Sequence, residues 1–176
     1  MGEVKLGDLS APEKLSREQD LAAFDSGETV LDEWLRRRAT QNETSGASRR
    51  YVVCAGTRVV GYYSLAVGAA THEQVAGRIK RNMPHPIPVM ILGRLTVDRT
   101  FQGKRIGTGL LKDAVLPTLQ AANIAGIRAL LVHAISDPAK RFYEAYGFIA
   151  SPVDPMTLMI TLVEAERIIF NAKRSD

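Results

Sequence analysis

The segment Ile91–Leu111, ILGRLTVDRTFQGKRIGTGLL, combines an apolar run, a glycine-rich basic loop and the start of an amphipathic stretch. The residues from 89 to 97 are mostly β-branched or aliphatic and are too few for a typical buried helix, so they predict a strand. The apolar positions beyond residue 107 recur at helical spacing. The segment therefore predicts a strand, a loop and a helix in direct succession.

The loop between this strand and this helix has the composition of an anion site. A helix N-terminus presents free N–H groups to an anion, and glycines let a ligand approach the backbone closely. Donors and positive charge surround the three glycines, in the order Gln102, Gly103, Lys104, Arg105, Gly107 and Gly109. The loop therefore suits a ligand that carries a diphosphate, although an ordinary strand-to-helix turn on a basic surface would show the same pattern.

The residues LxVD followed by QGKRIGTGLL resemble the acetyl-CoA motif of the GNAT superfamily of N-acetyltransferases. In that motif Q/R-x-x-G-x-G/A leads from a strand into a helix and cradles a pyrophosphate. By this resemblance Gln102 takes the first position, Gly107 the second glycine and Gly109 the small residue that follows. Arg105 departs from the pattern because it stands at the usual first glycine, where its N–H and guanidinium remain possible phosphate donors.

The resemblance implies acetyl-CoA as the cofactor, with strand residues offering main-chain groups to the pantetheine arm and loop residues holding the phosphates. It implies an α/β (α+β) fold with one GNAT-type domain, a mixed central sheet flanked by helices, and the acetyl-CoA loop between the central strand and the next helix. The expected cofactor contacts are Leu95, Thr96, Val97, Gln102, Gly103, Lys104, Arg105, Ile106, Gly107, Thr108, Gly109 and Ser136.

A second motif, SDPAKRFYEAYGF, resembles the N-x-x-A-x-x-F-Y-x-x-x-G-F segment of GNAT enzymes, with Ser136 at the usual asparagine position. Acetyl transfer to an amine expels a thiolate, and a phenol can protonate that sulfur while remaining protonated itself at neutral pH. Tyr143 is therefore the predicted general acid, with a packing role as its alternative. Tyr146 is placed with Phe142 on one helix face and is expected to pack.

The rest of the chain shows further helical and strand patterns. We expect a helix over 16–24 from the S-x-x-Q capping box of Ser16 and Gln19, and a short helix with Asp137 at its N-cap that ends at Gly147. Glu43–Ser48 is expected to be a loop. Further helices are expected over 29–42, 108–121 and 163–173, one or two turns over 71–79, and strands over 51–55, 59–67, 126–135, 148–150 and 156–162.

Length and composition fit an ordinary globular chain. With 176 residues, 45% of them hydrophobic and 24% charged, we expect a single domain over 1–176. We expect a cytoplasmic protein, because no apolar run approaches the roughly 20 residues of a membrane span and no signal-peptide pattern opens the chain. The single cysteine, Cys54, is expected to be a buried thiol, and the three histidines show no ligand spacing, so no metal is predicted.

Positive charge is concentrated in one part of the chain. The segment from Arg78 to Arg105 contains seven cationic side chains and a single carboxylate, Asp98, so its net charge is +6, compared with +4 for the whole chain. The three cations that precede the central strand (Arg78, Lys80 and Arg81, hereafter the basic triplet) cannot be assigned to cofactor phosphates. Nucleic acid is their predicted partner.

Across nearly the whole chain, FDSGETVLDEWLRRRA, ASRRYVVCAGTRVVGYYSLAVG and the two motifs resemble the TacT-like and AtaT-like toxins of type II toxin–antitoxin systems. The resemblance implies acetylation of the α-amine of aminoacyl-tRNA, a block of translation, and a cognate ribbon-helix-helix antitoxin; we also expect a homodimer and no membrane partner. An aminoacyl α-amine, with a reference pKa near 7.7 to 8 that the ester lowers further, needs no strong base. The tRNA-contact candidates are Arg36, Arg37, Arg38, Arg49, Arg50, Arg78, Lys80, Arg81 and Arg94.

Three alternatives remain open. Arg94 interrupts the apolar strand, where a cation is costly unless it is paired, so contact with substrate competes with a structural pairing to Asp32 or Glu33. The chain could instead be a GNAT enzyme for a small amine or a protein N-terminus, although polyamine sites favour carboxylates over a basic strip. A non-catalytic binder that keeps the cofactor loop is the third alternative, and Tyr143 argues against it.

Overall fold

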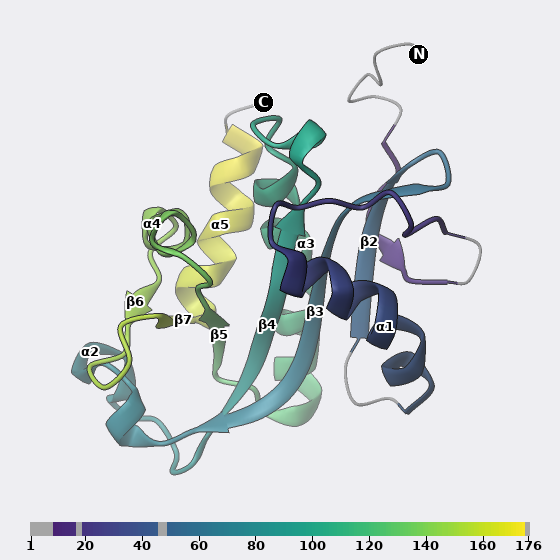
Figure 1. The fold of residues 1–176 in the computed structure, drawn as a ribbon. Helices are drawn as coiled ribbons and strands as arrows, with labels where there is room; N and C mark the ends of the chain where they lie inside the picture. Colours follow the sequence, from purple (N-terminus) through teal and green to yellow (C-terminus); the bar gives the residue numbers. More distant parts are fainter. Residues whose placement is uncertain (1–8, 17–18, 46–48, 175–176) are drawn as a thin grey trace. The chain divides into compact units, whose positions relative to one another are not determined.

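The computed structural model describes residues 9–16, 19–45 and 49–174, without the side chains of 38–45 and 170–174. The described chain contains both helices and strands (Figure 1). In order they are β1 (Glu13–Lys14), α1 (Thr29–Ser45), β2 (Arg49–Ala55), β3 (Arg58–Ala70), η2 (His72–Gln74), α2 (Gly77–Lys80), β4 (Ile87–Val97), η3 (Arg99–Phe101), α3 (Ile106–Ala125), β5 (Ala129–His133), α4 (Asp137–Ala145), β6 (Ile149–Ala150), β7 (Thr157–Thr161) and α5 (Leu162–Arg174).

The strands form a seven-stranded sheet in the order β1-β2-β3-β4-β5-β7-β6. β4 pairs with β5 in parallel, whereas β1 with β2, β2 with β3, β5 with β7 and β6 with β7 are antiparallel. The predicted mixed α/β fold is thereby confirmed. The chain divides into two compact units, unit 1 (Met1–Leu65 and Arg94–Asp113) and unit 2 (Ala66–Gly93 and Ala114–Asp176), and each is described by itself.

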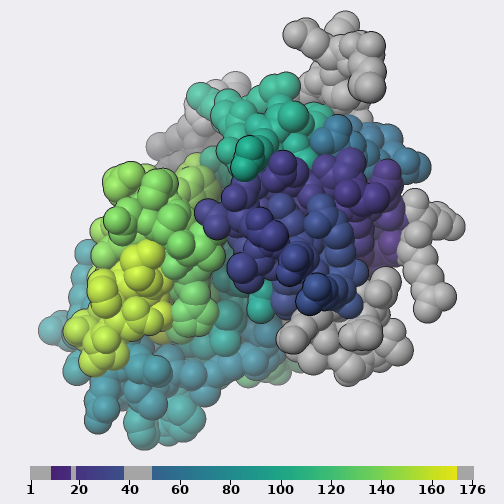
Figure 2. All heavy atoms as spheres, in the orientation of Figure 1, coloured from purple at the N-terminus to yellow at the C-terminus, as the bar shows by residue number. Residues whose placement is uncertain are grey.

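Unit 1 has its own core, built where α1 packs on β2. Phe24, Leu35 and Tyr62 are fully buried there, and Figure 2 shows the dark-blue atoms of α1 next to the purple atoms of the residues that precede it. Gly61 on β3 brings the start of α3 close: a Cβ added at Gly61 would lie 3.2 Å from Leu110 Cδ1 and 3.3 Å from Ile106 Cγ2. The glycine therefore fixes how deeply the first turns of α3 sit on the strand.

Unit 2 forms a second core around β5. β5 is buried along Ala129–Val132, and α5 packs on β5 and β7 while α4 packs on β7. The strands predicted over 126–135 and 156–162 and the helix predicted over 163–173 correspond to β5, β7 and α5. Gly147, with φ of 98°, follows the last residues of α4 and ends that helix as expected. Among the described helices none is long and apolar enough to cross a membrane.

The helix predicted over 16–24 is wrong for the described residues of that range, 16 and 19–24, and residues 17 and 18 lie outside the described residues. The capping-box contact does form, since the Ser16 N–H donates to Gln19 Oε1 at 2.7 Å. The chain then pairs with a hairpin instead of coiling: Asp20 N–H donates to Thr57 O at 2.7 Å, and Val59 N–H donates to Asp20 O at 2.9 Å. Tertiary pairing of the backbone overrides the local helix signal, and buried Phe24 anchors the segment.

Two helix ends also differ from the prediction. Glu43–Ser45 continue α1, although we expected them in a loop, and residues 46–48 of that loop lie outside the described residues. The N-cap of α4 is Ser136, whose Oγ accepts from Ala139 N–H at 3.2 Å, and Asp137 is the first helical residue. Serine and aspartate are both good N-caps, so the sequence alone did not distinguish these neighbours.

Candidate functional site

The last four residues of β4 lie beyond its pairing with β5. The parallel register with β5 covers Val89–Leu92, and two residues later Arg94 has φ of 56°, a left-handed conformation in the middle of a strand. The segment Leu95–Val97 that follows is extended, as the predicted contacts with a pantetheine arm require. The Val97 carbonyl also accepts from Gln102 Nε2 at 2.9 Å, which ties the strand end to the loop behind it.

The loop after η3 leads directly into α3. Arg105 has φ of 64°, so the position where the motif has a glycine does adopt the left-handed conformation that glycine favours. α3 begins at Ile106, and the N–H groups of its first residues have no acceptor within the helix. Lys104 and Arg105 are exposed beside them. Amides at a helix start and adjacent cations are the groups that an anion site needs, and the binding role of these residues stays a prediction.

The glycines of the loop leave room that the protein does not use. A Cβ added at Gly103 or Gly109 would meet no atom within 4 Å, and one at Gly107 would meet only Leu95 Cδ2 and Val97 Cγ2 at 3.9 Å. Packing within unit 1 therefore does not require these glycines. The open space, the amides at the start of α3 and the adjacent cations fit the diphosphate of acetyl-CoA.

A buried carboxylate, Asp98, organises the turn between strand and loop. It is 1% exposed and accepts four hydrogen bonds: from Asp25 N–H at 3.0 Å, from Thr100 N–H at 3.0 Å, from the Thr100 hydroxyl at 2.7 Å and from Arg58 Nη2 at 3.3 Å. Burial alone would raise the pKa of Asp98, but the hydrogen bonds from Thr100 and Asp25 and the charge of Arg58 outweigh it and lower that pKa. Asp98 is therefore ionised at neutral pH and holds two chain segments together.

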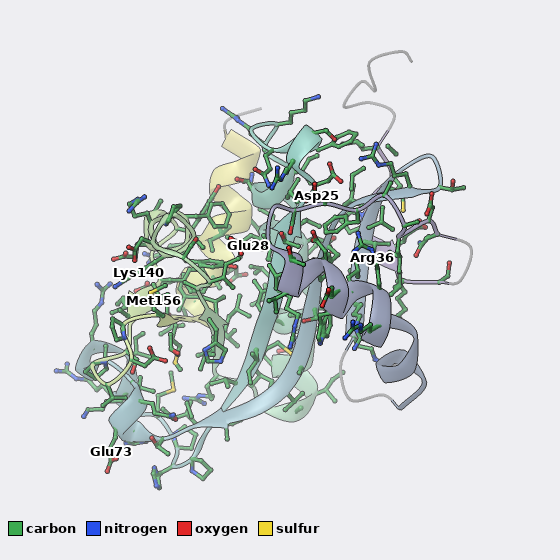
Figure 3. The ribbon with its side chains drawn as sticks, viewed as in Figure 1. Asp25, Glu28, Arg36, Glu73, Lys140 and Met156 are labelled. Carbon is green, nitrogen blue, oxygen red and sulfur yellow. The ribbon has the colours of Figure 1, made fainter. Side chains whose placement is uncertain are left out.

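The segment before α1 is tied to the loop by further bonds. Arg99 N–H donates to Asp25 O at 2.8 Å, and Gln102 Nε2 donates to Ser26 O at 3.1 Å. Ser26 in turn donates from its N–H and hydroxyl to the carboxylate of Asp32 on α1. Figure 3 shows Asp25 and Glu28 at the N-terminal end of α1, with Arg36 farther along the helix. The start of α1 and the cofactor loop are thus one hydrogen-bonded structure within unit 1.

Tyr143 lies in unit 2, on α4. It is 5% exposed, and its ring makes edge contacts with Phe142 and Phe148, with centroids 5.2 and 5.4 Å away. Phe142 and Tyr146 are less buried, so the interior side of α4 is the Tyr143 side. Burial raises the pKa of the Tyr143 phenol above its ordinary value. The phenol therefore keeps its proton at neutral pH, as a general acid must.

Ser136, the remaining cofactor candidate, also lies in unit 2. Its hydroxyl oxygen caps α4 by accepting from Ala139 N–H, and the hydroxyl proton is left for another acceptor. No three His, Cys, Asp or Glu side chains come together as a metal site among the described residues. Cys54 is a buried free cysteine, and burial raises the pKa of its thiol.

Most of the arginine and lysine candidates for tRNA contact are exposed. Arg37 lies 3.9 Å from Glu33, and Arg78 lies 3.0 Å from Glu164, but these are surface pairs of small energy that a phosphate can replace. Arg36 donates to the carbonyl of Phe24. The side chain of Arg38 lies outside the described residues. The exposed candidates are Arg36, Arg37, Arg49, Arg78, Lys80, Arg81 and Arg94.

Arg50 does not suit the role predicted for it. Its side chain is fully buried on β2, with Cζ 4.8 Å from the ring centroid of Trp34, so it is placed as a structural cation and not as a surface ligand for phosphate. The pattern of strand β2 contains the explanation, because Arg50 occupies an alternating position with buried Val52 and Cys54. This alternating pattern is visible in the sequence, but Arg50 was predicted to be a surface contact because its side chain is charged.

Sequence reasoning also missed two residues of the site. The role of Asp98 depends on donors that lie 40 and 73 residues away in the chain, which no local pattern reveals. Trp34 was assigned only to the apolar face of α1, yet Arg94 Cζ lies 3.9 Å from its ring centroid. For Arg94 the structure therefore shows a stack on an aromatic ring, and the proposed pairing with Asp32 or Glu33 stays a prediction.

Known proteins resemble this chain over most of its length. Residues 47–150 match the family described as "Acetyltransferase (GNAT) domain". A "tRNA-acetylating toxin" from Mycobacterium tuberculosis is 47% identical over 160 residues, 91% of this chain and 96% of that protein. The structure of AtaT complexed with acetyl-methionyl-tRNAfMet matches with a TM-score of 0.83 and 27% identity, covering 91% of this chain and 98% of that chain.

A second similar structure is a tyrosine-to-phenylalanine mutant of the AtaT toxin bound to the C-terminus of the antitoxin AtaR and acetyl-CoA. It has a TM-score of 0.78 and 27% identity, and covers 92% of this chain and 98% of that chain. The family match spans more than half of the chain, and the mycobacterial relative is nearly half identical over most of it. Together with the strand, loop and helix described above, these matches show that the chain belongs to the GNAT family of acetyltransferases.

Proposed function

We propose that this acetyltransferase transfers the acetyl group of acetyl-CoA to the α-amine of aminoacyl-tRNA and acts as a toxin that blocks translation. The observation that carries the proposal is the 47% identity to a tRNA-acetylating toxin over 91% of the chain. The similarity to AtaT, whose structure is known with acetyl-methionyl-tRNAfMet, supports the same acceptor. An acetylated α-amine cannot attack a peptidyl ester, which explains the block.

Unit 1 supplies the proposed cofactor contacts. The first N–H groups of α3 and the cations Lys104 and Arg105 hold the diphosphate of acetyl-CoA, and the extended main chain of Leu95–Val97 meets the pantetheine arm. When bound, acetyl-CoA supplies an acetyl thioester. Asp98 and Gln102 act by positioning, because they fix the loop through the segment before α1.

Unit 2 supplies the proposed general acid. The amine nitrogen would bond to the acetyl carbon and the bond from that carbon to sulfur would break, while the Tyr143 O–H would donate its proton to the leaving sulfur. The nitrogen would release one proton to solvent, and the Tyr143 phenolate would regain one from solvent. A raised phenol pKa suits this role, since the group must be protonated before the sulfur leaves. The incoming amine needs no strong base, because much of an aminoacyl α-amine is already neutral.

The tRNA requires phosphate contacts, and we propose the exposed cations for them. The basic triplet on and beside α2 is the main group, with Arg36, Arg37, Arg49 and Arg94 in unit 1. Arg38 remains a candidate from the sequence, whereas Arg50 is left out because it is buried. We also propose that the protein is a cytoplasmic homodimer held inactive by a cognate ribbon-helix-helix antitoxin. Both units are proposed to belong to one GNAT domain, because the family match spans residues of both.

The test is acetyl-CoA consumption by the purified chain with three kinds of acceptor: bulk charged tRNA, polyamines and peptides with a free N-terminus. Turnover with charged tRNA and little with the others is expected. Deacylated tRNA is the matched control, because it has the same phosphates but no α-amine. Turnover with polyamines or peptides alone would replace the proposed acceptor with the small-amine or N-terminal alternative.

A further inference from the structure

An exposed guanidinium and an aromatic ring form a layered stack in unit 1. Arg94 Cζ lies 3.9 Å from the ring centroid of Trp34, and Arg94 is exposed while Trp34 is partly buried. Trp34 continues inward to Tyr62, whose ring is nearly parallel at 12° with a centroid distance of 6.2 Å. The Tyr62 hydroxyl donates to Leu31 O at 3.0 Å, which fixes the innermost layer. Arg94, Tyr62 and the buried Arg50, whose Cζ is 4.8 Å from the ring centroid, thus all lie against Trp34, and Arg94 is the exposed member of the group.

The backbone of Arg94 has a left-handed conformation that residues other than glycine rarely adopt. Arg94 has φ of 56° within β4, where an L-residue crowds its Cβ against the neighbouring carbonyl oxygen. A glycine would adopt this conformation without strain, yet the chain has an arginine. Non-glycine residues in such conformations concentrate at functional sites, where the surrounding structure maintains the strain.

The position of Arg94 along β4 indicates which substrate it faces. The proposed pantetheine contacts, Leu95–Val97, follow Arg94 directly, and the diphosphate loop comes after them. Because a strand advances about 3.3 Å per residue, Arg94 lies roughly 10 Å before Val97, on the side away from the phosphates. The reactive thioester is at that end of a pantetheine arm. With the pantetheine arm bound along Leu95–Val97 as proposed, Arg94 would lie beside the acceptor and away from the adenine of the cofactor.

We propose that the Arg94 guanidinium, backed by Trp34, is a stacking platform for the 3′-terminal base of the acceptor tRNA. The inference rests on the proposed function and names how its substrate is held. The base at the end of a single-stranded 3′ terminus is free to leave its neighbours, and arginine planes and aromatic rings are the surfaces on which such bases stack. A lysine could hold a phosphate equally well, but only a planar cation offers a face to a base.

The chain's single tryptophan is part of the proposed platform, so its fluorescence reports on ligands at Arg94. The probes are two short single-stranded RNAs, one ending in CCA and one in which the last nucleotide lacks its base. Both are titrated into protein saturated with CoA, so that the cofactor's own adenine site is filled. We expect the CCA probe to change Trp34 emission and to bind about 5- to 50-fold more tightly than the abasic probe.

Two variants of Arg94 distinguish the contribution of the planar guanidinium from that of the positive charge. Arg94→Lys keeps the charge, and Arg94→Gly suits the left-handed backbone, so both are expected to fold and to bind acetyl-CoA. In both, the preference for the CCA probe should disappear. Lys14→Ala, which removes an exposed cation of unit 1 outside the proposed site, is the matched control and should keep the preference.

The possible outcomes distinguish the proposed stacking platform from the proposed function, which is acetylation of aminoacyl-tRNA. If the wild-type chain acetylates charged tRNA but binds the two probes equally, or if Arg94→Lys keeps the full preference, the platform is wrong and the proposed function stands. If the CCA preference depends on Arg94 but charged tRNA is not acetylated, the platform stands and the proposed acceptor is wrong.

Discussion

Asp98→Asn tests whether one buried carboxylate holds the cofactor loop to the segment before α1. The asparagine keeps a single acceptor oxygen. If that oxygen serves the N–H and hydroxyl of Thr100, the new amide NH₂ faces two donors, Asp25 N–H and Arg58 Nη2. The variant therefore loses the hydrogen bonds from Asp25 and Arg58 and brings donors against donors in a site that is 1% exposed.

The expected cost follows from these contacts. A hydrogen bond to a charged group contributes about 1.5–3 kcal/mol, and leaving a buried donor unsatisfied costs about 1–3 kcal/mol. The Arg58 pair adds little, because the Arg58 side chain is 40% exposed and surface pairs contribute at most about 1 kcal/mol. These contributions overlap, so Asp98→Asn should lower the free energy of unfolding by about 2–4 kcal/mol at pH 7.

The stabilisation by Asp98 should depend on pH in one direction. The folded pKa of Asp98 is lower than its ordinary value of 3.8, so its stabilising contribution is fully present above 3.8 and is lost as pH falls through the folded pKa. Urea unfolding, followed by circular dichroism, should show a constant gap between wild type and variant at neutral pH that shrinks below about pH 3.8. Asp154→Asn, at an exposed turn, is the matched control and should cost much less. A loss below about 1 kcal/mol, or a gap that persists into acid, would refute this account of Asp98.

Three further predictions concern the reaction. Tyr143→Phe should fold and bind acetyl-CoA but transfer acetyl groups about 10² to 10⁴ times more slowly, and unchanged turnover would remove Tyr143 as the acid. Gly107→Asp should abolish acetyl-CoA binding in calorimetry, since the carboxylate enters the phosphate site, whereas Gly77→Asp should keep it; wild-type affinity in Gly107→Asp would exclude the loop. Replacing the basic triplet with alanine should weaken tRNA binding and flatten its salt dependence without changing acetyl-CoA affinity, and an unaltered salt slope would make it solvated surface.

The sequence predicted the elements whose signals are local. The strand, loop and helix around residues 91–111 were found because apolar runs, glycines and helical spacing all occur within one short segment. The end of α4 at Gly147 was found for the same reason. These patterns depend on neighbours in the chain, so one sequence is enough to read them.

What the sequence did not predict depends on residues far apart in the chain. The capping box of Ser16 and Gln19 forms its contact without a helix, because Asp20 pairs with a hairpin some 40 residues later. Arg50 was read as surface charge although the fold buries it. The bonds of Asp98 and the stack on Trp34 likewise join distant segments. Composition and periodicity contain no information about such pairings.

Gly61 gives β3 a part in positioning the start of α3, although none of the proposed cofactor contacts lies on that strand. The missing side chain lets Ile106 and Leu110 rest against β3, and α3 begins at Ile106. A methyl group there would meet both side chains at 3.2–3.3 Å, so these side chains, or the helix start that carries them, would have to give by a few tenths of an ångström. Hydrogen bonds weaken steeply as their geometry departs from the optimum, so amides displaced by that amount would hold an anion less well. The absence of a Cβ at Gly61 thus sets the distance between β3 and the start of α3, and with it the position of the amides at the proposed phosphate site.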